Sequence, residues 1–260
     1  MPLSNNKHVQ LLWSFISILI ATAIVLIFRP NFITATLLFF GLPSAYLAYL
    51  KPSNLKKAFA SGALFGLLWG FPFDLVAEYN NAWAWSTGTS LLYSPKILGI
   101  VSPEILLWFF LWVFSVVIFY EHFCDRESRK ISRNIRPSIY MGAAVFILVT
   151  IIFFVQPALL QFKYAYLVLG CISVLPFLYL IYRKPRIVPK LLSLMPFFIL
   201  LYLSFELVAL YLNLWSFPGH YIGYVSLFNL QFTFEEFLFW IIASSAVTAS
   251  YHELFVDDQK

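Results

Sequence analysis

Apolar residues run along this chain in long stretches that few polar residues interrupt. Eight stretches approach the length of about 20 residues that a helix needs to cross the hydrocarbon core of a bilayer. The pattern predicts an all-α, polytopic membrane helical bundle with about eight transmembrane helices. The expected spans are Val9 to Phe28, Ile33 to Leu50, Ala58 to Ala77, Glu104 to Phe119, Ile139 to Val155, Tyr164 to Tyr182, Leu191 to Leu212 and Glu235 to Tyr251.

The pattern of the first half recurs in the second half at an offset of 131 to 133 residues. The matched pairs include Leu42 with Leu175, Asp74 with Glu206, Trp83 with Trp215, Glu104 with Glu235 and Tyr120 with Tyr251. The single-residue steps in the offset are expected if one copy has lost residues in its loops. We predict one membrane domain over 1–260, with repeat 1 at about 1–123, a basic linker at about 124–137 and repeat 2 at about 138–260. Four spans per repeat make the two four-helix repeats parallel.

Composition supports a membrane location, because 61% of the residues are hydrophobic and only 11% are charged, with a mean hydropathy of +0.82. With the N-terminus inside, 14 of the 17 Lys and Arg residues fall on the inner side. Cytoplasmic loops retain positive charge, so we expect both termini in the cytoplasm of an integral protein of the cell membrane. The net charge of +5 is then a topology signal, and we expect no nucleic-acid partner. The first apolar run is too long for a cleavable signal peptide.

Motifs for nucleotides and metals are lacking in the sequence. No glycine-rich phosphate loop occurs, and the histidines and cysteines lack the spacing of a metal site. We therefore expect no cofactor and no metal. His122 and His252 fall near inner span ends, where the sequence predicts interfacial caps.

Acidic residues inside spans are costly and usually have a function. Asp74 and Glu206 fall at matching depths near the outer ends of their spans, and three more acids begin spans from that side: Glu104, Glu235 and Glu236. One interpretation is helix capping, because Ser102-Pro103-Glu104 and Thr233-x-x-Glu236 have capping patterns. The other is acid–base chemistry, which needs apolar surroundings so that a carboxyl can hold a proton. Both interpretations stay open from the sequence.

Aromatic residues follow these acids in both halves. Trp83, Trp85 and Trp215 lie nine to eleven residues after Asp74 or Glu206, in outer connections (Glu78 to Pro103 and Asn213 to Thr233) that we expect at the headgroup layer. Each Trp could be a membrane anchor. Ring faces also stabilise cations by about 0.5 to 2 kcal/mol in water-poor sites, so acids beside rings suit carbocation chemistry on a hydrophobic substrate.

This succession of motifs resembles the repeat of the lycopene cyclase domain family, membrane enzymes of carotenoid biosynthesis, in its fused two-repeat form. The resemblance covers about 58–123 and 191–255. The residues that carry it are Pro72-Phe73-Asp74, Trp83-x-Trp85, Pro103-Glu104 and Tyr120-Glu121, then Glu206, Trp215-x-Phe217, Glu235-Glu236-x-x-Phe239 and Tyr251. The chain departs from the Pro-x-Glu-Glu signature of the family in both copies. In the first, Ile105 replaces the second acid and Pro103 directly precedes Glu104; in the second, no proline comes before the acids, and Glu206 stands where an Asp is expected.

The resemblance implies a redox-neutral isomerase reaction without a cofactor. An acid protonates the terminal double bond of a linear carotene such as lycopene, the cation closes a six-membered ring, and a carboxylate removes a proton. The implied catalytic residues are Glu104, Glu235 and Glu236, with Asp74 and Glu206 as the upstream acids, and the implied substrate-binding residues are Trp83, Trp85, Trp215 and Phe239. The implied partners are a polyene substrate and membrane lipid. The resemblance leaves open whether the chain forms a homo-oligomer or associates with other carotenoid enzymes.

Two alternatives remain beside this interpretation. The first is a related end-group enzyme for a longer or modified carotenoid. The second is a non-catalytic carotenoid or lipid binder, or a small transporter. Ion-coupled transport is disfavoured, because the acids gather near one surface and the first, second, fifth and sixth spans contain none.

Overall fold

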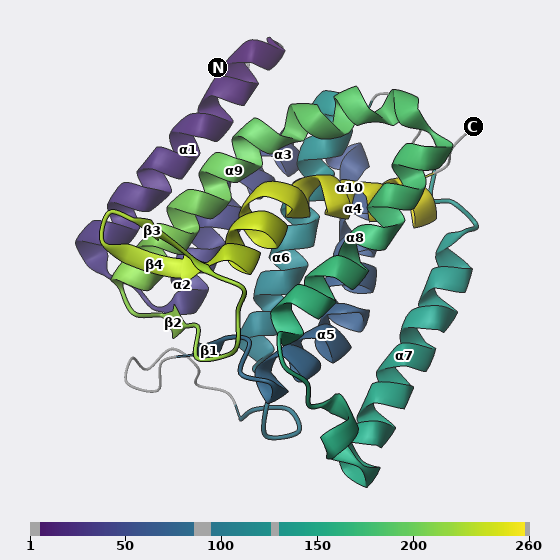
Figure 1. Cartoon of the computed structure of the whole chain (residues 1–260). Helices are drawn as coiled ribbons and strands as arrows, with labels where there is room; N and C mark the ends of the chain where they lie inside the picture. Colours follow the sequence, from purple (N-terminus) through teal and green to yellow (C-terminus); the bar gives the residue numbers. More distant parts are fainter. Residues whose placement is uncertain (1–5, 86–94, 126–129, 258–260) are drawn as a thin grey trace.

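The computed structural model describes residues 6–85, 95–125 and 130–257, and these residues form an almost entirely helical bundle (Figure 1). Within those ranges, seven helices are long and apolar enough to cross a membrane. The all-α fold class and the membrane character are therefore confirmed. The seven helices are Lys7–Phe28, Phe32–Leu50, Pro52–Tyr79, Pro103–Cys124, Ile135–Val155, Ala165–Arg183 and Pro185–Tyr211.

The eighth predicted span is helical but differs in character from the other seven. It begins as a π-helical segment, Glu236–Ala243, and continues as α10 (Ser244–Phe255), which packs against α6, α8 and α9. Polar side chains of α10 are buried: Ser244, Ser245, Thr248, Ser250, His252 and Glu253. Ser244, Ser250, His252 and Glu253 form hydrogen bonds inside the bundle, so the segment combines the burial of a core helix with a polarity too high for a lipid-facing span.

Several of the long helices are built from more than one piece. Their bounds are α1 (Lys7–Phe28), α2 (Phe32–Thr36), α3 (Leu42–Leu50), α4 (Leu55–Ser61), α5 (Gly70–Tyr79), α6 (Pro103–Phe119), α7 (Ile135–Val155), α8 (Ala165–Arg183) and α9 (Val188–Tyr211). π-helical segments join α2 to α3 (Leu37–Gly41), join α4 to α5 (Gly62–Leu68) and extend α6 (Tyr120–Cys124). Short strands occupy the outer connections: β1 (Ala84–Trp85) pairs antiparallel with β2 (Trp215–Ser216), and β3 (Tyr224–Leu227) with β4 (Leu230–Thr233).

The predicted linker and the first outer connection are described only in part. Residues 126–129 of the linker and residues 86–94 of the connection lie outside the described residues. After the linker gap, Ser132 N donates to Val256 O at 2.8 Å, so the start of the second half lies beside the end of the chain.

A π-helical segment accounts for the first one-residue step between the halves, from an offset of 133 to one of 132. A π-turn accommodates one extra residue within a helix. Lys57 and Lys190 are 133 residues apart, whereas Asp74 and Glu206 are 132 apart, and the π-helical Gly62–Leu68 lies between Lys57 and Asp74. This one-residue change in offset therefore lies inside a helix. We had expected such changes to lie in loops.

A second π-helical segment changes the alignment of the last span. Glu104 and Glu235 are 131 residues apart at the start of the helices, and Glu236–Ala243 then inserts one residue into the second half. Beyond it the offset becomes 132. Tyr120 therefore corresponds to His252, and its predicted match with Tyr251 is one residue out of register.

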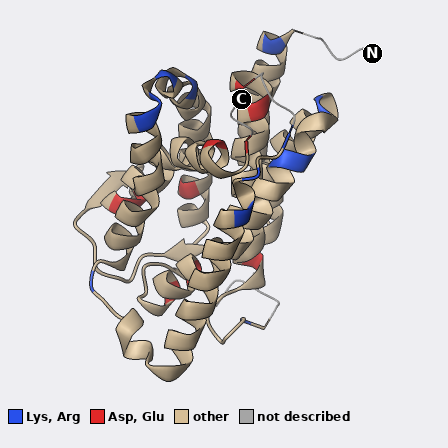
Figure 2. Cartoon of the chain, turned by 90° about the vertical axis from the view of Figure 1, so that its right-hand side faces the viewer, with Lys and Arg blue, Asp and Glu red and all other residues tan. Residues whose placement is uncertain are grey.

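Helix α6 runs through the centre of the bundle and forms close contacts with the Gly62–Leu68 segment. A Cβ on Gly66 would lie 2.7 Å from the Cα of Phe110, so only glycine permits this approach. Helices α1 and α7 lie at the periphery, and α7 buries only Ser138 and Gly142. Most Lys and Arg residues gather at the end of the bundle near the chain termini, whereas Asp and Glu lie largely inside it (Figure 2).

Candidate functional site

An apolar cavity of about 340 Å³ lies among α5, α6, α7, α8, the Glu236–Ala243 segment and α10. Aromatic rings dominate its wall, because seven of the eight tryptophans of the chain line it. They are Trp69, Trp83, Trp85, Trp108, Trp112, Trp215 and Trp240. Of the carboxyl groups in the described part of the chain, Asp74 and Glu236 line this cavity. One comes from each half.

Asp74 lies on α5 and is fully buried. Its Oδ1 accepts a hydrogen bond from Trp83 Nε1 at 3.1 Å, and no N–H or O–H group of the described residues donates to its second oxygen. Glu78, one helical turn later, neighbours Asp74 and accepts from Trp85 Nε1 at 2.8 Å. Lys96 pairs with Glu78 at 3.2 Å. The outer carboxyl is thus held by a cation, while Asp74 faces the rings.

Glu236 enters the cavity at the start of the π-helical segment. Its backbone N–H donates to Thr233 Oγ1 at 3.0 Å, which is the first bond of the predicted capping box. Its carboxyl does not complete that box, because Oε2 accepts from the Tyr166 hydroxyl. The Thr233 side chain therefore caps the backbone N–H of Glu236, and the Glu236 side chain extends to the cavity.

Glu206 lies behind Glu236 on α9. It is fully buried, its Oε1 accepts from Trp215 Nε1 at 3.1 Å, and its carboxyl neighbours that of Glu236. Two carboxylates this close in an apolar site cannot both carry charge without a large cost, so the pair is suited to sharing one proton.

The other two predicted acids lie outside the cavity wall. Glu104 accepts from the Ser102 hydroxyl, and Glu235 Oε1 accepts from the backbone N–H of Ile222 at 2.8 Å. Both carboxyls are buried against the turns that lead into their helices. These two hydrogen bonds join the carboxyls to the turns ahead of the helices and are not helix-capping bonds. Ile105, at the position matching Glu236, does line the cavity.

The four predicted substrate-binding residues, Trp83, Trp85, Trp215 and Phe239, all line the cavity. The Trp85 ring packs edge-on against Trp215 at 5.4 Å between centroids, and the two residues pair across the β1–β2 ladder. This ladder joins the two outer connections. It places the tryptophans of both halves on one side of the cavity.

Tyr166 is the residue that the sequence did not identify. Its ring meets Trp83 edge-on at 5.3 Å, and its hydroxyl donates to Glu236, so it links the acid sites of both halves. Trp108, Trp112 and Trp240 were also missed, although the spacing of four between Trp108 and Trp112 was a visible signal that they share a helix face. Tyr166 carries no such signal, because the first half has no polar residue at the matching position that would reveal the repeat.

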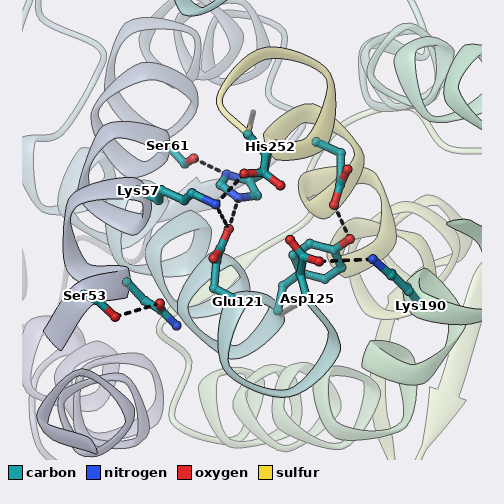
Figure 3. A network of polar contacts seen from close by, with 11 residues as sticks. Ser53, Lys57, Ser61, Glu121, Asp125, Lys190 and His252 are labelled. Carbon is teal, nitrogen blue, oxygen red and sulfur yellow. Dashed lines mark hydrogen bonds and ion pairs between the residues drawn. The ribbon is translucent and has the colours of Figure 1, made fainter. Parts of the chain in front are cut away.

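A second polar cluster lies at the basic end of the bundle (Figure 3). Lys57 Nζ pairs with Glu121 Oε1 at 2.8 Å and with Asp257. His252 contacts the same Glu121 oxygen through Nε2 at 2.9 Å and Ser61 Oγ through Nδ1 at 2.9 Å. His252 is fully buried, so the predicted interfacial cap is wrong here: the ring is held by polar partners inside the bundle.

The two halves exchange partners in this cluster. Lys57 of the first half binds Asp257 of the second, and Lys190 of the second half binds Asp125 of the first at 3.1 Å. The hydroxyl of Tyr120 likewise donates to Glu253, as His252 contacts Glu121. His122 is also buried, with its Nε2 2.8 Å from Gln10 Oε1, so it too differs from the predicted cap.

Glu121, His252 and Asp257 come close enough together to hold a metal ion. Lys57 already contacts two of them, and its ammonium supplies the positive charge that the carboxylates need. Asp257 lies beyond the end of α10, where burial raises the pKa of its carboxyl and the Lys57 ammonium opposes that rise. The cluster is therefore an ion-pair network between the two halves.

Comparison of the chain with protein-family models, curated proteins and solved structures found no match.

Proposed function

We propose that the chain is a membrane cyclase that closes the end group of a linear carotene, such as lycopene, to a β-type ring. The observation that carries the proposal is the pair of carboxyls, Asp74 and Glu236, that face one apolar, ring-lined cavity inside a membrane bundle. The resemblance of the duplicated acid and tryptophan motifs to the lycopene cyclase domain family supports the same reaction.

The reaction needs one proton to enter the substrate and one to leave. One carboxyl of the cavity protonates the terminal carbon–carbon double bond, the resulting tertiary cation forms the new ring bond, and the other carboxylate removes a proton to restore a double bond. No electrons are gained or lost. General acid and base groups each contribute about 10² to 10⁴ in rate, and the tryptophan faces lower the energy of the cation.

We further propose that both termini lie in the cytoplasm and that the bundle resides in the cell membrane. The basic end seen in Figure 2 supports this orientation, because cytoplasmic loops retain Lys and Arg. The acids Asp74 and Glu236 then lie toward the outer leaflet.

Expression in a lycopene-accumulating host, with pigments separated by chromatography, tests the proposal. We expect cyclised carotenes from the natural sequence and a loss of at least about 100-fold in Glu236→Gln. Glu235→Gln is the matched control: it changes the neighbouring acid, whose carboxyl binds the Ile222 N–H, and should retain conversion within about tenfold. Membrane levels of each variant are measured in parallel.

Unchanged lycopene, and unchanged longer or hydroxylated linear carotenoids, would overturn the cyclase proposal. New products from only the longer or modified substrates would identify the related end-group enzyme. Pigment that co-purifies unaltered would identify a binder.

A further inference from the structure

The cavity is lined on one side by two helices that are held by different parts of the bundle. Helix α7 contributes Val145 and Val149, and α8 contributes Leu169, Gly170, Ile172 and Ser173. Ile172 lines the cavity although 57% of it is exposed. A lining residue that is more than half exposed marks a place where the cavity wall is also the outer surface of the protein.

Helix α7 is anchored to the first half. A Cβ on Gly142 would lie 2.7 Å from Trp69 Nε1, and the Phe146 ring packs on Phe71 at 4.7 Å between centroids. The side chains of Val145 and Val149 are thereby left on the face toward the cavity. The buried Trp69 Nε1 has no hydrogen-bond partner among the described residues, and Trp69 also lines the cavity.

Helix α8 is anchored to the second half. Gly170 lies directly against the ring of Phe239, and Tyr251 donates to the backbone oxygen of Ser173 at 3.1 Å. Its most extensive contacts are with α10 of the second half, and it also contacts α5 of the first half, which α7 contacts as well. Because Val145 of α7 and Ile172 of α8 both line the cavity and Ile172 is also exposed, we place the opening between these two helices.

The opening lies within the hydrocarbon layer. Val145 is at the middle of α7, and Ile172 is about two turns inside α8, well away from both ends of these spans. The hydrocarbon core of a bilayer is about 30 Å thick. Residues near the middle of a helix that crosses it therefore lie among the lipid acyl chains. A compound dissolved in the bilayer therefore reaches the cavity without crossing water.

We infer that a long linear isoprenoid enters sideways from the bilayer between α7 and α8, end first, and that the cavity encloses one end group at a time. The inference rests on the proposed function. A volume of about 340 Å³ is near the lower limit of about 300 Å³ for small-molecule sites, which suits an end group. The remainder of the isoprenoid stays among the lipid acyl chains, so the protein does not recognise the far end of the substrate.

Bulky substitutions at the opening test the route. Ile172→Trp combined with Val145→Trp should lower the initial rate of conversion at least about tenfold. The matched control places the same residues on lipid-facing positions of the same helices, Ile147→Trp with Leu175→Trp, which are 56% and 58% exposed and do not line the cavity. The control pair should stay within about twofold. Equal thermal stability of the two proteins in nanodiscs is required, and equal rates in both would overturn the inference.

A binding assay separates this inference from the proposed function. Methyl parinarate, an uncharged linear tetraene, accepts energy from the tryptophans of the cavity, so its arrival is followed without any reaction. The Ile172→Trp/Val145→Trp protein should take up the probe at least about tenfold more slowly than the control pair. Slow uptake without cyclisation in the natural sequence would reject the enzyme and retain the route. Uptake at the same rate in both variants would reject the route.

Substrates with one altered end give a further test. A carotene already cyclised at one end should be converted at its linear end within about threefold of the rate for lycopene. A loss of tenfold or more would show that the far end is read, and would overturn the end-first arrangement.

Discussion

Asp74 and Glu206 occupy the same place in the two halves, and each forms the same hydrogen bond with a tryptophan. Each is fully buried, and each accepts a hydrogen bond at 3.1 Å from a tryptophan nine residues later. Their wider surroundings differ. Asp74 faces the cavity, whereas Glu206 lies behind Glu236 against a packed aromatic cluster. The shared bond is therefore part of the frame of both halves and does not by itself make a reactive site.

The surroundings differ at two pairs of positions. Tyr166 of the second half meets Trp83 of the first edge-on, and Phe32 of the first half meets Trp215 of the second edge-on. Glu236 accepts from Tyr166, and the position that matches Glu236 in the first half is Ile105. A hydroxyl and a carboxyl in one location thus correspond to two apolar side chains in the other. Around Phe32 the space is filled by buried rings: Phe39, Phe40, Phe205 and Trp215.

The comparison between Asp74 and Glu206 is tested most strongly by replacing each of these acids separately. Asp74→Asn keeps a side chain of the same shape but cannot exchange a proton, so conversion should fall about 10² to 10⁴-fold. Glu206→Gln should cost less than about tenfold, because Glu206 touches the cavity only through Glu236. Pigment chromatography measures both. Equal losses would show that the two acids act as one unit.

The ion-pair network offers a second matched pair. Lys57 is 2% exposed in its side chain and contacts two carboxylates, whereas the Lys190 side chain is 39% exposed. Lys57→Met leaves two buried acids without their cation and should lower the free energy of unfolding by about 3 to 5 kcal/mol. Lys190→Met should cost at most about 1 kcal/mol, since solvent screens its pair. Thermal unfolding in nanodiscs checks both; equal costs would contradict the assigned asymmetry.

Introducing a hydroxyl into the filled half should destabilise it. Phe32→Tyr places an oxygen among rings without a partner, at a cost of about 1 to 3 kcal/mol. Adding Ile105→Glu rebuilds the pair seen at Tyr166 and Glu236, so the double variant should be more stable than the sum of the two single changes. If the free-energy costs of Phe32→Tyr and Ile105→Glu simply add in the double variant, the two side chains do not contact each other as Tyr166 and Glu236 do.

A modest effect is expected from Tyr166→Phe. It removes one hydrogen bond to the Glu236 carboxyl and leaves the ring contact with Trp83 intact, so conversion should fall about tenfold, equivalent to about 1.4 kcal/mol. Stability should change little, because phenylalanine fits the matching place in the other half. A fully active Tyr166→Phe protein would exclude the hydroxyl from the site.

The sequence by itself determined the membrane helices and the positions of the buried acids and tryptophans. Long apolar runs can satisfy their backbone groups in a bilayer only as helices, so composition along each stretch is sufficient for that prediction. The spacing of nine residues between acid and tryptophan is local as well, and it recurs in both halves.

Only the tertiary structure decided which acids share the cavity. Neighbouring residues of a helix point in different directions, so Glu236 faces the cavity while Glu235 binds the Ile222 N–H. The π-helical segment that follows shifts the helical phase by one residue, so His252 takes the place corresponding to Tyr120. The meeting of Tyr166 with Glu236, and of Lys57 with Asp257, joins residues far apart in the chain. Such contacts depend on how whole helices pack, which no local pattern records.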